Sequence, residues 1–181
     1  MSDFSIEQYE KNVENIGLKI LELSKQIEKE KFLVASENLN LFKAFHSQFL
    51  DSGFGDILHI TIESRSEYDD NNYYTVDVVS FFFKGHGSFE YYDDCFSVYG
   101  DDVLDICKSL GVEEPEDIES MEDFASALNA PLFTNVVQVI YEACSNEELS
   151  KIGIFGYNDV DNMSFSDFID LVENNIKFKN N

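Results

Sequence analysis

The chain has 181 residues, the length of one compact domain, and its 36 acidic and 12 basic side chains give a net charge of −24. A 44% apolar content with 17 phenylalanines supplies a core, which excludes a disordered chain. This charge also excludes direct binding to nucleic acid or to an anionic membrane, because both need a basic surface. We find no apolar run of membrane-spanning length and no basic signal-peptide start, so we expect a soluble cytoplasmic protein.

The N-terminal sequence predicts a long helix over residues 5–31. Ser5 and Gln8 form a capping box at its start. Apolar residues then recur at alternating spacings of three and four, the heptad period of a coiled-coil seam. These seam residues are Ile6, Tyr9, Val13, Ile16, Ile20, Leu23 and Ile27. The favoured interpretation is that the seam packs on the rest of the same domain; the alternative is that it binds a second copy, as a homodimer, or a partner.

The sequence after this helix predicts a break, a short helix and a sheet. We expect the break at residues 36–40 and a second, shorter helix whose face is continued by Leu41, Phe42, Phe45 and Phe49 and that ends at the 53–55 glycine pair. Residues 58–62 alternate apolar and polar side chains, which predicts a half-buried strand. The polar residues 64–72 predict a turn. Strands are then expected at 73–83, 88–92 and 95–99, rich in β-branched and aromatic residues.

Helices are expected to dominate the rest of the chain. The pattern predicts helices at 103–110, at 121–128 after Ser120, in a short segment after Ser145 and at the C-terminus after Ser164, with a short strand at 152–155. Residues 134–143 fit either a helix or a strand. The sum is an α+β fold: a small antiparallel sheet of three to four strands packed with helices, and a long N-terminal heptad-patterned helix. We treat residues 1–181 as one domain with a helical arm (1–50), an acidic sheet-and-helix part (51–150) and a C-terminal helix (151–181).

The negative charge is concentrated in the middle of the chain. Residues 1–50 and 151–181 each have a net charge of −2, whereas residues 51–150 hold 23 acidic and three basic side chains, a net charge of −20. Arg65, Lys84 and Lys108 are the only cations there. A halophilic shell would be acidic over the whole surface, so this distribution indicates instead a directed surface for a basic partner.

Carboxylates and tyrosines occur together in this middle segment, mainly where strands are expected to end. Regular structure can hold carboxylates several ångströms apart, as phosphates are held along a nucleic-acid strand, and tyrosine supplies contact area at low entropic cost. The candidate partner-binding residues are Asp69, Asp70, Asp93, Asp94, Asp101, Asp102, Glu113, Glu114, Glu116, Asp117, Glu122, Asp123, Tyr91 and Tyr92. The alternative to partner binding is that this acidic face contacts only solvent.

Catalytic and metal sites find little support in the sequence. Residues 159–170 can be laid on a calcium loop, but Met163 occupies a ligand position and Ser164 replaces the turn glycine, so we assign no metal. None of the common catalytic motifs occurs, and no cofactor is expected. The three cysteines, Cys95, Cys107 and Cys144, are predicted to be reduced, buried thiols. A metal-dependent enzyme built on clustered carboxylates is the least favoured alternative.

In composition, the chain resembles phage-encoded inhibitors of bacterial defence nucleases, of the anti-restriction and anti-CRISPR type, and immunity proteins that neutralise nuclease toxins. That resemblance implies a DNA mimic. The sequence therefore predicts a non-enzymatic acidic inhibitor that blocks a basic nucleic-acid-binding protein, such as a defence nuclease or a nuclease toxin. The alternative is an interaction or regulatory module that binds its partner through the heptad helix, in which case the acidity serves only solubility.

Overall fold

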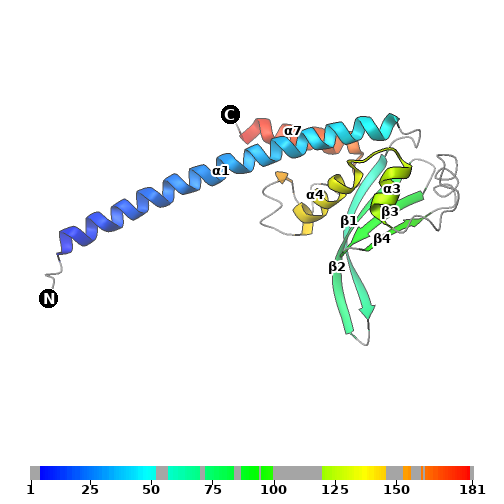
Figure 1. Ribbon diagram of the computed structural model, residues 1–181. Coiled ribbons are helices and arrows are strands. Elements are labelled where there is room, and N and C mark those ends of the chain that lie inside the picture. Colours follow the sequence, from blue (N-terminus) through cyan, green and yellow to red (C-terminus); the bar gives the residue numbers. More distant parts are fainter. Residues whose placement is uncertain are drawn as a thin grey trace.

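A computed structural model of the chain describes residues 5–51, 57–69, 72–83, 87–93, 95–99, 120–145, 153–155, 160 and 162–179. Within them, helices and a four-stranded antiparallel sheet form the predicted α+β fold, and the strands follow one another in the order β1-β2-β3-β4. The helices contact one face of the sheet, and the N-terminal half of α1 projects far beyond this body (Figure 1).

Helix α1 (Ile6–Asp51) is one continuous helix of 46 residues, so the predicted break at residues 36–40 is wrong. Ser36, Asn38 and Asn40 are weak helix formers, but none of residues 36–40 is glycine or proline, and each lowers helix stability by less than about 1 kcal/mol. Ser36 donates its hydroxyl to the carbonyl of Phe32 at 2.8 Å, so it stays within the helix. Full burial of Phe42, Phe45 and Phe49 against the body then outweighs the low propensity.

The strands are β1 (Ile57–Asp69), β2 (Asn72–Phe83), β3 (Gly87–Tyr92) and β4 (Cys95–Tyr99). Ile60 and Ile62 are buried as predicted, and a register shift between Ile57 and His59 turns Ile57 inward as well. The side chain of Leu58 lies outside the described part. The turn predicted at residues 64–72 is wrong, because β1 continues to Asp69 and pairs with β2 along its whole length.

The remaining helices are α3 (Met121–Ala127), α4 (Phe133–Ser145) and α7 (Phe165–Lys179). The ambiguous residues 134–143 are therefore helical. The predicted caps are confirmed: Ser120 Oγ accepts the Asp123 N–H at 3.1 Å, and Ser164 Oγ accepts the Asp167 N–H at 3.1 Å. No strand occurs in the described residues 153–155. The helices expected at 103–110 and after Ser145 fall on residues that are not described.

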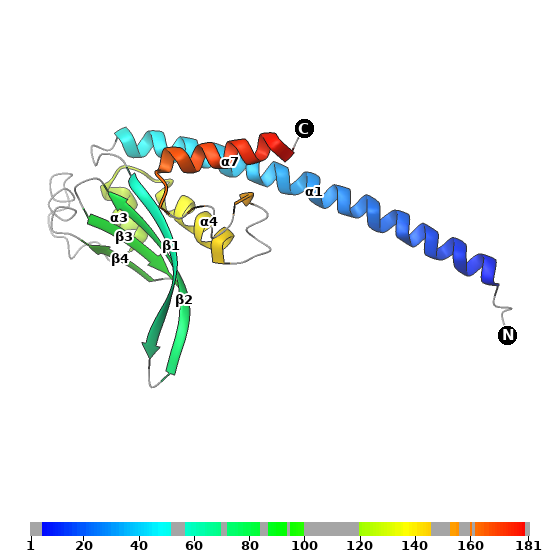
Figure 2. The same ribbon diagram turned by 180° about the vertical axis from the view of Figure 1, so that it is seen from behind.

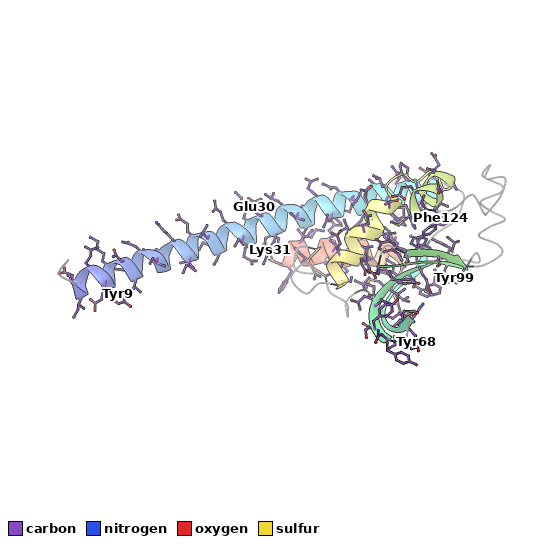
Figure 3. All side chains as sticks on the ribbon, turned by 60° about the horizontal axis from the view of Figure 1, so that its bottom comes forward. Tyr9, Glu30, Lys31, Tyr68, Tyr99 and Phe124 are labelled. Atoms are coloured by element: carbon purple, nitrogen blue, oxygen red, sulfur yellow. The ribbon has the colours of Figure 1, made fainter. Side chains whose placement is uncertain are left out.

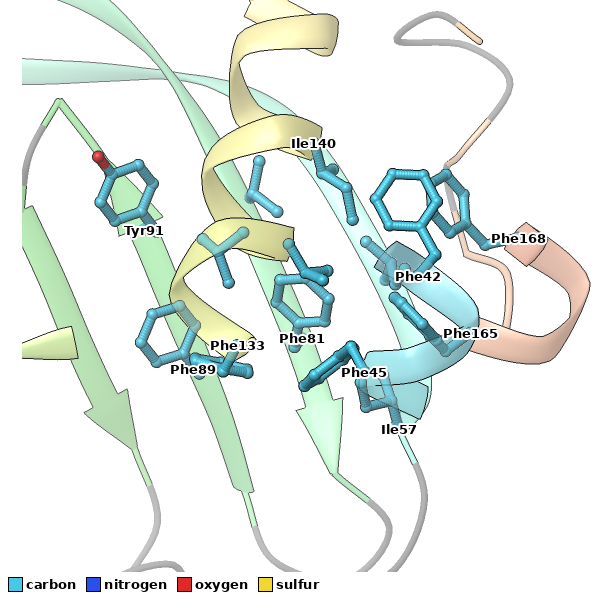
Figure 4. Close-up of a cluster of buried hydrophobic side chains, with 14 of the residues drawn as sticks. Phe42, Phe45, Ile57, Phe81, Phe89, Tyr91, Phe133, Ile140, Phe165 and Phe168 are labelled. Carbon is cyan, nitrogen blue, oxygen red and sulfur yellow. The ribbon is translucent and has the colours of Figure 1, made fainter. Parts of the chain in front are cut away.

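A phenylalanine cluster joins the helices to the sheet (Figure 4). Phe165 of α7 is fully buried, with its ring centroid 5.2 Å from that of Phe45 in α1 and 6.4 Å from that of Phe81 in β2. On the other side of the cluster, Phe133 of α4 lies edge-on to Phe89 of β3 at 4.9 Å. One core thus contains residues of the N-terminal helix, of the sheet with α3 and α4, and of the C-terminal helix, as expected of a single packing unit.

Helix α7 runs beside the C-terminal half of α1 (Figure 2). Phe168 packs on Phe42 at 5.0 Å, and Glu173 accepts hydrogen bonds from Lys43 at 3.1 Å and from Lys177 at 3.0 Å. The ammonium groups of Lys177 and Lys43 lower the pKa of Glu173. These contacts fix α1 to the body from about its middle onward.

Candidate binding surfaces

Strands β1 and β2 extend beyond β3 as a two-stranded arm, Ser64–Asp69 with Asn72–Asp77. Strand β3 pairs only with Val79–Phe83 of β2, so the described strands leave the arm outside the sheet. Near its tip the rings of Tyr68 and Tyr73 lie 4.8 Å apart and are 58% and 80% exposed. Figure 3 shows Tyr68 pointing into solvent at the end of the arm. The arm carries the predicted contact residue Asp69 to the far end of the molecule.

The outer face of the sheet, opposite the helices, gathers charged and phenolic side chains. Because strand residues alternate, Glu63, Arg65 and Glu67 of β1 lie on this face, together with Glu90 and Tyr92 of β3. Arg65 donates to Glu90 at 3.1 Å and to Glu63 at 3.2 Å. These hydrogen bonds, the one with Glu90 first, raise the pKa of the Arg65 guanidinium above its usual value. The positive charge of Arg65 is therefore already compensated within the face.

Tyr92 is the centre of a second cluster on the outer face. Burial raises the pKa of its phenol above the usual 10.0, and electrostatic interactions with Cys95, Glu67, Tyr99 and Tyr74 raise it further. Tyr74 and Tyr99 are themselves 43% and 50% exposed. Rings, a thiol and a carboxylate from all four strands thus share one partly exposed surface. Cys95, predicted to be buried, is exposed, whereas Cys144 is buried as predicted.

The structure separates the predicted contact residues that it describes. Asp93 occupies the turn after β3 with φ 43°, at the level where the arm leaves the sheet, since Tyr91 pairs with Val79. Glu122 and Asp123 lie instead in the first turn of α3, which packs on the opposite end of the sheet, where Phe124 stacks on Phe89 at 5.5 Å. The two sets therefore do not form one continuous patch.

Two predicted contacts are already used inside the fold. Tyr91 is only 6% exposed and meets Tyr141 edge-on at 5.1 Å, so assigning it to a contact surface was wrong; strand alternation turns it inward and leaves Tyr92 outside. Asp123 is exposed, but its carboxylate accepts the Ser120 N–H at 2.9 Å and is committed to capping α3. The remaining candidates lie outside the described residues: Asp70, Asp94, Asp101, Asp102, Glu113, Glu114, Glu116 and Asp117.

The heptad seam of α1 is exposed, so the prediction that it packs on its own domain is wrong. Every residue from Ser5 to Glu30 is exposed, and the first buried residue of the helix is Ala35. The exposed fractions of the seam side chains lie between 50% for Val13 and 68% for Ile6. The reason is length: the body reaches only the second half of a helix that is about 69 Å long at 1.5 Å per residue. We call Ile6–Glu30 the overhang.

The described part of the chain contains neither a candidate metal site nor a helix that could span a membrane. It contains no group of three or more His, Cys, Asp or Glu side chains placed to hold a metal ion. Asp159 and Asp161 of the calcium-like segment are not described, and Met163 instead bonds through its carbonyl to the N–H of Ile60 at 2.8 Å. None of the described helices is long and apolar enough to cross a membrane.

Sequence reasoning missed most of the outer-face cluster. Glu67 and Tyr74 lie on adjacent strands and Cys95 lies two strands further along the chain, and only the strand register brings all three to one face. Glu63, Arg65 and Glu67 are every second residue, the spacing of side chains on one face of a strand, and this spacing could have predicted the outer face. The expectation of a turn at 64–72 prevented that interpretation. Comparison with family models, with curated proteins and with solved structures gave no significant match.

Proposed function

We propose that the protein is a non-enzymatic, acidic binding protein that occupies the nucleic-acid-binding surface of a basic protein and so inhibits it. The observation that carries the proposal is the uncompensated charge of residues 51–150, a net −20 in which Arg65 is already paired with Glu63 and Glu90. A field of this size attracts a basic partner and raises the association rate, while carboxylates replace phosphates at its surface.

The arm and the outer face supply the contact area in this proposal. Tyr68 and Tyr73 at the arm tip and Tyr99 at the sheet edge are large, exposed and stiff, which suits an interface that must also exclude water. Glu67 adds a carboxylate that acts on Tyr92 of the outer face, and Asp93 adds one at the turn after β3. A surface of carboxylates is complementary to a groove that binds phosphates, so the partner we infer has such a groove, as a defence nuclease or a nuclease toxin does.

A capture experiment tests the proposal. The protein is immobilised, exposed to cell extract at low salt, and washed with double-stranded DNA or, in parallel, with an uncharged polymer. Proteins held through their nucleic-acid-binding surface are released by DNA alone, because DNA competes for that surface. Retention of all captured protein in the presence of DNA would overturn the proposal, as would the absence of any captured basic protein.

Charge-reversal variants locate the surface. The double change Glu67→Lys with Asp93→Lys should weaken capture of the DNA-released protein at least about tenfold, because it removes two carboxylates and adds two like charges. The matched control, Glu7→Lys with Glu14→Lys, makes the same change of net charge on exposed helix positions and should leave capture within about threefold. Equal losses in both variants would show that only net charge matters and would remove the assignment to this surface.

A second candidate function is supported by the exposed seam: an interaction or regulatory module that docks through the overhang. Apolar docking changes little with salt, whereas binding by the acidic surface weakens steeply between low and physiological salt. If the captured protein stays bound at high salt and is lost when Ile16 or Ile20 is changed to Glu, this second function replaces the first.

A further inference from the structure

The overhang is a helix of about 37 Å whose apolar side faces solvent. Val13, Ile16, Ile20, Leu23 and Ile27 are each 50–59% exposed. Scattered exposed leucines need no explanation, but a continuous stripe with a 3.5-residue period has the spacing of a two-helix seam. We propose that the overhang pairs in antiparallel orientation with the overhang of a second copy of this chain.

The helix phase determines which way the seam points. Ile6 and Phe42 are 36 residues apart, as are Tyr9 and Phe45, and 36 residues make about ten turns of 3.6 residues. Phe42 and Phe45 are fully buried against the body. The seam therefore faces the same side of α1 as the body, and the space next to the overhang is bounded at one end by the body itself (Figure 1).

This geometry selects the antiparallel orientation. In a parallel, in-register pair the partner's α1 would continue past residue 31 into the volume that the body and α7 occupy. An antiparallel partner ends where the body begins, because its overhang has the same length as the free space. Centred near residue 18, the pairing sets Val13 against Leu23, Ile16 against Ile20 and Tyr9 against Ile27 of the second copy, so every seam residue from 9 to 27 meets another apolar residue.

Charge favours a second copy over a basic or an anionic partner. Residues 6–30 carry six acidic and four basic side chains, so two overhangs approach with little repulsion, and neither a cationic nor an anionic surface is strongly attracted. The antiparallel pairing also keeps the acidic bodies apart. The first buried residue, Ala35, lies about 25 Å along the helix from the pairing centre, so the bodies begin about 50 Å apart, far beyond the Debye length of about 8 Å.

The buried area is adequate for a specific dimer. Each seam side chain exposes on the order of 100 Å², so the six paired ones in each of two copies amount to about 1,200 Å², at the lower end of the range of about 1,200–2,000 Å² for stable interfaces. A surface of this size requires no further contact between the bodies.

Sedimentation velocity with a matched pair of variants tests the association. Ile20→Glu changes a seam residue that is 59% exposed, and Leu21→Glu changes its off-seam neighbour, 54% exposed. The wild type and Leu21→Glu should sediment as dimers, and Ile20→Glu should raise the dissociation constant by about a hundredfold or more, because each dimer buries two introduced carboxylates. A monomeric wild type, or equal effects of the two changes, would overturn the proposal. Both sites are exposed, so far-UV circular dichroism should show an intact body in each variant.

Orientation is tested by spin labels on Glu7→Cys, with the three native cysteines changed to serine. The antiparallel dimer places the two labels about 33 Å apart along the axis, whereas a parallel dimer places them within about 15 Å. Small-angle X-ray scattering of the unmodified protein provides the second measurement: two separated bodies support the proposal, and two adjacent bodies contradict it. Because self-association should persist at high salt while capture of the basic protein should not, failure of this inference and failure of the proposed function are distinguishable.

Discussion

Phe165 connects the long helix to the sheet, and its replacement by alanine tests the packing most severely. The ring is fully buried, with centroids at 5.2 Å from Phe45, 5.6 Å from Phe168 and 6.4 Å from Phe81. Losing its burial alone removes roughly 2–3 kcal/mol, and the cavity and lost ring contacts bring the expected loss to about 4 kcal/mol. For a domain of typical stability, about 5–15 kcal/mol, this is a large fraction.

Urea unfolding followed by far-UV circular dichroism measures the loss. The matched control is Phe178→Ala in the same helix, where the ring is 84% exposed and the expected change is below about 0.5 kcal/mol. The corresponding melting temperatures should differ by about 10 °C for a chain of this size. Equal stabilities of the two variants, or a loss below about 1 kcal/mol for Phe165→Ala, would refute the argument that this ring joins α1, α7 and the sheet.

Three further changes address caps, charge and ionisation. Ser164→Ala removes the acceptor of the N-cap bond of α7 and should lower the free energy of unfolding by about 1 kcal/mol in the same urea assay. Arg65→Ala leaves the carboxylate of Glu90, whose side chain is 13% exposed, without its guanidinium and should lower stability by about 1–3 kcal/mol, a loss that disappears when Glu90 is also changed to Gln. The folded-state pKa of Tyr92 is raised above its unfolded value near 10.0, so its contribution to stability is present below that pH and is lost as pH rises through the folded pKa. In a spectrophotometric titration of tyrosinate, the phenol of Tyr92 should therefore ionise at higher pH than an ordinary tyrosine. The Tyr92→Phe change should remove that late component.

Local patterns predicted the elements that end in recognisable caps or face the core. The alternation at Ile60 and Ile62 and the serine caps at Ser120 and Ser164 each express one local interaction, and each is confirmed. The break at 36–40 was wrong because tertiary burial of Phe42 outweighs weak local propensity. Local sequence contains no information about such a distant contact.

The arm and the overhang were mispredicted for a related reason. Prediction assumes that a strand or an apolar seam is buried in its own domain. The 64–69 segment is polar because the arm lies beyond the core and needs no buried side, and the seam of α1 is apolar although its own body never reaches it. Both Tyr91 and Tyr92 were assigned to the contact surface, although neighbouring strand residues face opposite sides of a sheet and only Tyr92 lies outside.

Binding of the acidic body to a phosphate-binding surface, as we propose it, should be visible in the salt dependence of one dissociation constant. The protein released from the immobilised chain by DNA is titrated with the wild type over a series of salt concentrations from low to physiological. If carboxylates replace phosphates at the interface, the logarithm of affinity should fall steeply and linearly with the logarithm of salt concentration, with a smaller slope for Glu67→Lys with Asp93→Lys. An affinity that does not change with salt, or that persists when DNA saturates the partner, would contradict this proposal.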